Sequence, residues 1–137
     1  LTLSADVKRD INGAYKGTTW SPSISYLTPL SKAVLVSVSA RAHHADGRYA
    51  RYYYSVTGAQ AAASGLPQFA AKAGWDSIGG GVLAAWDTSG DLRDGGFALF
   101  AIGGYTRMLG DAKRTPYTAI RGDADQWIAG AGLAYTF

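Results

Sequence analysis

Two adjacent histidines and a nearby aspartate, His43, His44 and Asp46, are the first residues in this sequence whose types suggest chemistry. Imidazole and carboxylate groups act as general acids and bases and as metal ligands. Adjacent residues of a strand point to opposite faces, however, so the two histidines cannot both bind one ion. The chain also has no Gly-x-Ser-x-Gly motif and no second histidine cluster. We therefore expect no enzyme, no bound metal and no cofactor, and we expect the histidines to form a solvated pair.

Two motifs that contain aspartate have both a functional and a structural interpretation. Arg121–Asp123 (RGD) is the tripeptide that integrins recognise, and it lies in a predicted surface loop, where an adhesive role would require it. Asp111, Asp123 and Asp125 carry the oxygen ligands that calcium prefers, although their spacing matches no EF-hand loop. A solvated loop is the commoner explanation for both motifs.

Basic and aromatic residues mix in Arg48–Tyr54 (RYARYYY), as they do in proteins that bind single-stranded nucleic acid. The net charge of +3 is mild and the basic residues are spread along the chain, so we expect no nucleic acid. We expect this segment instead to extend a strand and to face anionic lipid head groups. The triplet Gly79–Gly81 lacks the Gly-Lys-Ser/Thr of a phosphate loop and predicts bending or close packing of a strand.

Alternation of apolar and polar residues recurs along the chain and predicts strands. Pro22 cannot donate to a ladder, so it marks a weak point or a bulge in one of them. A short helix is predicted at Thr57–Gly65, because Thr57 and Gln60 have capping-box spacing and glycine ends helices. The predicted strands are Leu1–Asp10, Thr19–Thr28, Val34–His43, Trp75–Asp87, Gly96–Met108 and Gln126–Phe137.

The pattern of strands and connections is typical of an outer-membrane barrel. No apolar run approaches the roughly 18 residues of a membrane helix, which excludes a helical membrane protein. Short turns alternate with two long polar loops, 44–74 and 109–125, which we expect on the extracellular side. The absence of cysteine is compatible with an oxidising compartment. Aromatic residues at the ends of the apolar faces suit interfacial girdles: Trp20, Tyr26, Trp86, Tyr105, Trp127, Tyr135 and Phe137.

The predicted fold is therefore an all-β, antiparallel transmembrane β-barrel, with residues 1–137 forming a single barrel domain. About six strands are too few to close, because single-chain barrels start at about eight. We expect a larger barrel of roughly 10–12 strands, of which this chain is the C-terminal half or one assembled protomer. Asp6, Lys8 and Arg41 are expected to face the lumen, where they either tune ion passage or form a salt-bridge network. Trp127, Leu133, Tyr135 and Phe137 are expected to form a lipid-facing stripe.

Three segments, Ala59–Val82, Tyr105–Tyr117 and Ala129–Phe137, closely resemble the outer-membrane protein V / MltA-interacting protein family. Met108 and Thr136 depart from the usual leucine and basic residue of that family. The residues that carry the family motifs in the two long loops are Gly65, Leu66, Pro67, Arg107, Gly110 and Asp111.

The resemblance implies a non-enzymatic barrel in the outer membrane of a Gram-negative bacterium. The implied role is a scaffold that links a lytic transglycosylase and a murein synthase to that membrane. A small-solute channel and a surface adhesion or binding barrel remain the alternatives. The other implied partners are outer-membrane lipid, lipopolysaccharide and the assembly machinery, which would recognise the strand that ends on Phe137.

Overall fold

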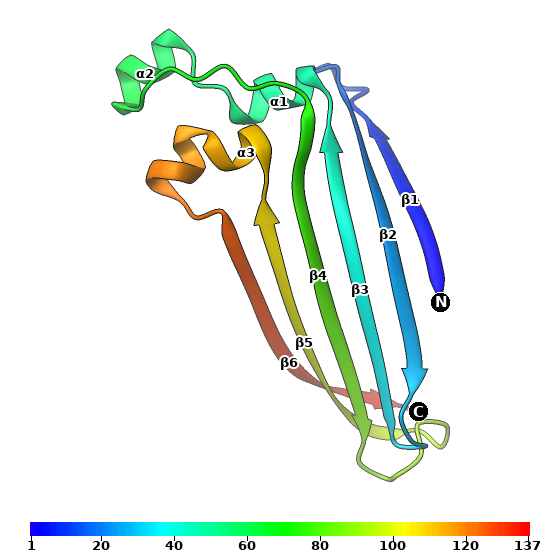
Figure 1. The fold of residues 1–137 in the computed structure, drawn as a ribbon. Helices are drawn as coiled ribbons and strands as arrows, with labels where there is room; N and C mark the ends of the chain where they lie inside the picture. The colour runs from blue at the N-terminus through cyan, green and yellow to red at the C-terminus, as the bar shows by residue number, and fades with distance from the viewer.

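The computed structural model describes all of residues 1–137. Its six strands form one antiparallel sheet in chain order, and each strand pairs only with its neighbours in the sequence (Figure 1). The predicted all-β antiparallel class and the six strands are thereby confirmed. The sheet is open, with one unpaired edge on the first strand and one on the last. The strands are β1 (Thr2–Arg9), β2 (Thr18–Pro29), β3 (Val34–Ala45), β4 (Gly74–Asp87), β5 (Gly96–Met108) and β6 (Asp125–Thr136).

All helices gather at one end of the sheet, which we call the helical end, and two short turns lie at the other (Figure 1). The β3–β4 connection contains α1 (Gly47–Tyr54) and α2 (Gly58–Ser64). The β5–β6 connection contains α3 (Gly110–Arg114) and a π-helical turn, η1 (Tyr117–Arg121). None of the helices is both long enough and apolar enough to cross a membrane.

The predicted helix at Thr57–Gly65 is confirmed as α2. Thr57 caps it, the reciprocal bonds of a capping box with Gln60 are present, and Gly65 ends it with a φ of 72°. The strand predicted over Arg48–Tyr54 is wrong, because that segment is α1. Asp46 caps α1 by accepting hydrogen bonds from the N–H groups of Arg48 and Tyr49, and this outweighs the strand propensity of tyrosine.

The pairing register gives the sheet two chemically different faces. The apolar face carries aliphatic and aromatic side chains from every strand; for example, Val38 lies opposite both Tyr26 and Val82. The hydroxyl face carries serine and threonine along β1–β4, and the hydroxyls of Ser4 and Ser23 lie 2.9 Å apart. Along β4–β6 the hydroxyl face becomes apolar, through Leu83, Phe100, Ile102 and Ile128.

The sheet has no hydrophobic core of its own. Only 13 of the 137 residues are buried, because a single layer leaves both faces open. The buried apolar residues gather instead around the helices and the loops that lead to them. They are Ala45, Ala50, Val56, Leu66, Ala71 and Ala112.

Pro22 and the glycines of β4 shape the sheet locally. Pro22 pairs with Ala5 of β1, but the ladder between β2 and β3 skips Ser21 and Pro22, as the predicted weak point requires. The predicted close packing of Gly79–Gly81 is confirmed at Gly79, where a Cβ would lie 2.5 Å from the Thr106 hydroxyl oxygen. It would also lie 2.7 Å from the backbone oxygen of Tyr105, which cannot move aside without disturbing the ladder.

We predict that Gly79→Val destabilises the folded chain by about 1–3 kcal/mol, as overpacking does elsewhere. Gly103→Val on the neighbouring strand is the matched control, because nothing lies within 4 Å of a Cβ there. Urea unfolding of the protein in detergent micelles measures both. An equal loss of stability in the two variants would contradict the close approach at Gly79.

Candidate functional site

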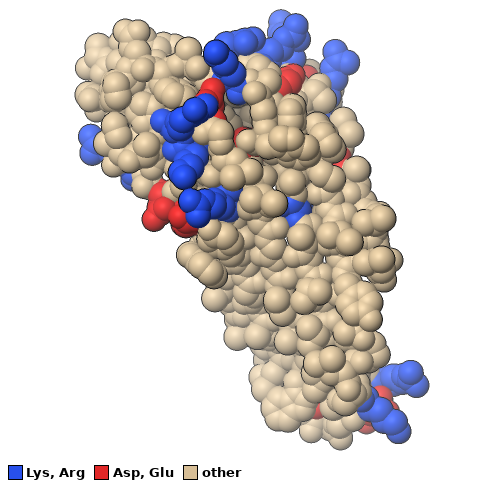
Figure 2. Space-filling model, viewed as in Figure 1, with Lys and Arg blue, Asp and Glu red and all other residues tan.

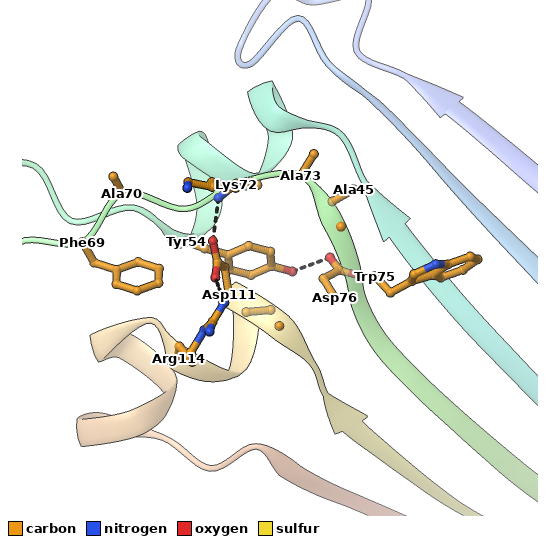
Figure 3. Close-up of a pocket in the computed structure, with 14 residues that line it drawn as sticks. Ala45, Tyr54, Phe69, Ala70, Lys72, Ala73, Trp75, Asp76, Asp111 and Arg114 are labelled. Atoms are coloured by element: carbon orange, nitrogen blue, oxygen red, sulfur yellow. Dashed lines mark hydrogen bonds and ion pairs between the residues drawn. The ribbon is translucent and has the colours of Figure 1, made fainter.

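Asp76 is a buried carboxylate at the helical end, only 5% exposed, with two side-chain partners. The His43 Nδ1 lies 2.5 Å from one carboxylate oxygen. The Tyr54 hydroxyl donates to the other oxygen over 2.7 Å (Figure 3). A β-bulge positions it, because the register between β3 and β4 shifts between His43 and His44. Asp76 thereby joins β3 and β4 to the C-terminal end of α1.

Tyr54 also connects α1 to the residue that caps the C-terminal end of α3. Burial and the hydrogen bond to Asp76 raise the pKa of Tyr54, so its phenol stays protonated and donates to the carboxylate. The Thr115 hydroxyl donates to the Tyr54 carbonyl oxygen over 2.6 Å, and Thr115 is only 1% exposed. We call His43, Tyr54, Asp76 and Thr115 the Asp76 lock, since they fasten both helical connections to the sheet.

Asp111 forms a second bridge between the two connections. It accepts the Lys72 N–H over 2.8 Å and an Arg114 guanidinium N–H over 2.6 Å. These two bonds hold the pKa of Asp111 below its ordinary value. Between the bridge and the Asp76 lock lies a cavity of about 560 Å³, into which the Phe69 ring also points (Figure 3).

The two histidines lie on opposite faces, as predicted, but they do not form a solvated pair. His43 joins the Asp76 lock, and no hydroxyl lies within hydrogen-bond distance of its ring. His44 contacts two indole rings, with centroid distances of 5.9 Å to Trp20 and 5.3 Å to Trp75. Both side chains therefore hold neighbouring elements together.

The three aspartates considered for calcium do not come together. Asp111 bridges the connections, and Asp125 accepts the Tyr105 hydroxyl and lies 3.5 Å from Arg107. Asp123 accepts the backbone N–H of Asp125. The structure contains no group of three potential ligands that could hold a metal ion. The RGD tripeptide, Arg121–Asp123, begins on the last residue of η1 and is exposed.

The motif residues of the long loops have structural positions at the helical end. Gly65 ends α2, and Leu66 is buried beside it, ahead of the exposed Pro67. Arg107 pairs with Asp125, and Gly110 begins α3 with a φ of 50°. The motif segments thus shape and join the two connections.

The remaining candidates are divided between the two faces. Asp6, Lys8 and Arg41 share the hydroxyl face, where Asp6 and Arg41 form an ion pair of 3.0 Å and Lys8 forms none. Beside the pair, a groove of about 380 Å³ crosses this face over β2–β6, lined largely by serine, threonine and glycine. Trp127, Leu133 and Tyr135 of β6 are exposed on the apolar face, and Phe137 follows the strand, also exposed.

Sequence reasoning missed Asp76, Tyr54 and Thr115. The available signal was a carboxylate, Asp76, inside a strand whose interior is otherwise apolar or made of small residues. Its partners lie 33 and 22 residues away, so spacing could not identify them.

We predict that Asp76→Ala opens the helical end, because it leaves His43 and Tyr54 without their carboxylate. The expected loss is about 1–3 kcal/mol of local stability. Amide hydrogen exchange should accelerate in both α1 and α3, while Asp94→Ala, at the opposite end, should leave it unchanged. Unaltered exchange in α3 would show that the Asp76 lock does not couple the two connections.

Comparison with known proteins identifies the family. The family model of the MltA-interacting protein MipA matches residues 1–137, the whole chain. No curated protein and no solved structure matches the chain. Because the family model covers every residue, the chain belongs to the MltA-interacting protein MipA family.

Proposed function

We propose that the chain forms part of a β-barrel in the outer membrane of a Gram-negative bacterium and acts there as a scaffold for murein-remodelling enzymes. The observation that carries the membrane part is the apolar face. Charged residues gather at the two ends of the molecule, and an uncharged band lies between them (Figure 2). A face this apolar is unfavourable in water and suits hydrocarbon.

Rows of aromatic side chains bound the apolar face at both ends. At the helical end, Trp20 and Trp75 have ring centroids 4.9 Å apart, and those of Tyr105 and Trp127 are 4.5 Å apart. At the turn end, the centroids of Phe97 and Tyr135 are 4.8 Å apart, and the exposed Trp86 extends the row. Such rows match the girdles that barrels place at both membrane surfaces.

Both open edges need a partner in lipid, because unpaired backbone groups are unfavourable in hydrocarbon. We therefore propose that this sheet is one part of a closed barrel of roughly 10–12 strands. In that barrel the apolar face contacts lipid and the hydroxyl face lines the lumen. The helical end faces the exterior and the turn end faces the periplasm.

The turn end supports the scaffold part of the proposal. Members of this family are described as MltA-interacting proteins, and MltA is a lytic transglycosylase. The β2–β3 and β4–β5 turns are joined, because the Leu92 N–H donates to the Lys32 carbonyl over 3.0 Å. Together they form one surface that exposes Lys32, Arg93 and Asp94 to a periplasmic enzyme.

A small-solute channel is the second candidate, and the groove on the hydroxyl face favours it. Its serine and threonine side chains offer hydrogen bonds to polar solutes. The exposed Asp6–Arg41 ion pair lies on this face, and Arg41 lines the groove. Bilayer conductance that changes on removal of the Arg41 charge would support this function over the scaffold.

We predict that Val38→Arg, on the apolar face, destabilises the bilayer-inserted protein by about 2–4 kcal/mol, the usual effect of arginine near the midplane. Ser39→Arg, one residue along on the hydroxyl face, should have a much smaller effect. Urea unfolding in phospholipid vesicles measures both. Equal losses, or a larger loss for Ser39→Arg, would contradict the assignment of the two faces.

We predict that the double variant Lys32→Glu, Arg93→Glu weakens capture of a purified lytic transglycosylase by about tenfold or more, because it reverses two charges on the joined turns. Lys113→Glu at the helical end is the control and should capture the enzyme normally. Full capture by the double variant would contradict the scaffold surface.

A further inference from the structure

Four tyrosines form an exposed aromatic cluster where the β1–β2 connection lies against α1. The Tyr15 ring is central, with centroids 5.2 Å from Tyr49, 5.8 Å from Tyr52 and 5.6 Å from Tyr53. Tyr52 is 56% exposed and Tyr53 is 47% exposed. We call these four residues the Tyr15 cluster. Neither the Asp76 lock nor the apolar face accounts for its exposed rings.

Three cations that form no ion pair are sequence neighbours of the tyrosines in the Tyr15 cluster. Lys16, Arg48 and Arg51 are exposed, and no ion pair of the structure includes them. The two nearby carboxylates, Asp10 and Asp46, are occupied by the backbone instead. The cations are therefore available to an anionic ligand.

Backbone hydrogen bonds lower the pKa of both carboxyl groups. Asp10 accepts the N–H groups of Lys16, Tyr15, Asn12 and Gly13, and these bonds lower its pKa. Burial alone would raise the pKa of Asp46. Hydrogen bonds from the N–H groups of Tyr49, Thr18 and Arg48, together with the positive charge of Arg48, outweigh that effect and lower the pKa.

The cluster is also held in place before any ligand arrives. The Arg48 guanidinium donates to the Lys16 carbonyl over 2.9 Å, which ties α1 to the β1–β2 connection. A Cβ at Gly17 would lie 2.5 Å from an Asp46 carboxylate oxygen and 2.9 Å from the Tyr49 nitrogen, so the two segments are in close contact. A rigid arrangement of this kind lowers the entropy lost on binding.

We propose that the Tyr15 cluster and its cations bind phosphorylated saccharides. Exposed tyrosine rings offer flat faces to the C–H groups of a sugar, with hydroxyls at their edges for its polar groups. The Tyr52 and Tyr53 hydroxyls have no hydrogen-bond partner within the protein. Guanidinium and ammonium groups beside the rings bind the phosphate through charge-assisted hydrogen bonds.

Two kinds of saccharide share this chemistry, a free sugar phosphate and the phosphorylated head group of a glycolipid. The Tyr15 cluster lies at the helical end, beyond the aromatic row that contains Trp20. Binding of a free sugar phosphate needs no bilayer, so it can be tested even if the proposed membrane function is wrong. The glycolipid source rests on the proposed orientation of the helical end.

The first experiment titrates the full chain in detergent micelles with glucose 6-phosphate, glucose and inorganic phosphate. The double variant Tyr52→Ala, Tyr53→Ala should weaken glucose 6-phosphate binding by about tenfold. The double variant Arg48→Gln, Arg51→Gln should weaken it by about as much. Binding of inorganic phosphate should be weakened only by the arginine replacements. Arg93→Gln, at the turn end, is the matched control and should bind normally.

One further variant and one measurement separate loss of the site from loss of the fold. Tyr52→Phe, Tyr53→Phe keeps the rings and should retain most of the binding, and circular dichroism checks the sheet of every variant. The proposal is overturned if the unaltered protein does not bind glucose 6-phosphate. It is equally overturned if the folded alanine variant binds glucose 6-phosphate as tightly as the unaltered protein does.

The second experiment identifies the source, using vesicles that contain lipopolysaccharide either phosphorylated or enzymatically dephosphorylated. The glycolipid is indicated if the alanine variant binds the phosphorylated vesicles more weakly than the unaltered protein does, with no such difference for the dephosphorylated vesicles. An effect confined to glucose 6-phosphate indicates a free solute. Equal binding of the unaltered protein to both kinds of vesicle, with no effect of the variants in either experiment, would contradict both sources.

Discussion

A single-layer sheet has no second layer to pack against, and this constraint governs the rest of the molecule. The chain forms 79 backbone hydrogen bonds, 60 of them within its helices and strands, yet it buries only 13 residues. Folded proteins normally gain most of their stability from apolar burial, and here the protein interior supplies little of it. Whatever covers the apolar face must therefore supply much of the missing stabilisation.

The connections at the two ends of the sheet are stabilised in different ways. The turn end is simpler, because its short connections are held by backbone bonds and by local side-chain bonds, such as those of Asp87 to the N–H groups of Ser89 and Gly90. The helical end builds a small interior of alanines and buried polar contacts around Asp76. Rigid packing is therefore concentrated where the connections are long, which is also where the Tyr15 cluster is held.

Most strands could be predicted because their alternation is strict, and a slip of one residue would exchange the two faces. The helix α2 could be predicted because its capping residues are local. The helix α1 could not, since its cap also accepts the N–H of Thr18, which lies 28 residues away. Likewise, Asp111, Asp123 and Asp125 suggested a cation site, whereas in the fold Asp111 bonds to Lys72 and Arg114 and Asp125 to Tyr105. Long-range polar contacts leave no periodic trace in a sequence.

Each strand pairs only with its neighbours in the sequence, and this affects the order in which the sheet can fold. The β1–β2, β2–β3 and β4–β5 hairpins close short loops, so the entropy lost in forming each of them is small. The β3–β4 and β5–β6 hairpins must close the two long connections and lose more. Strands can be added one at a time, and the bond between Leu92 and Lys32 then aligns two hairpins that have already formed. The outer edges of β1 and β6 remain unpaired in the folded sheet. Unpaired edges of this kind can pair with another chain, so in water such a sheet is prone to association.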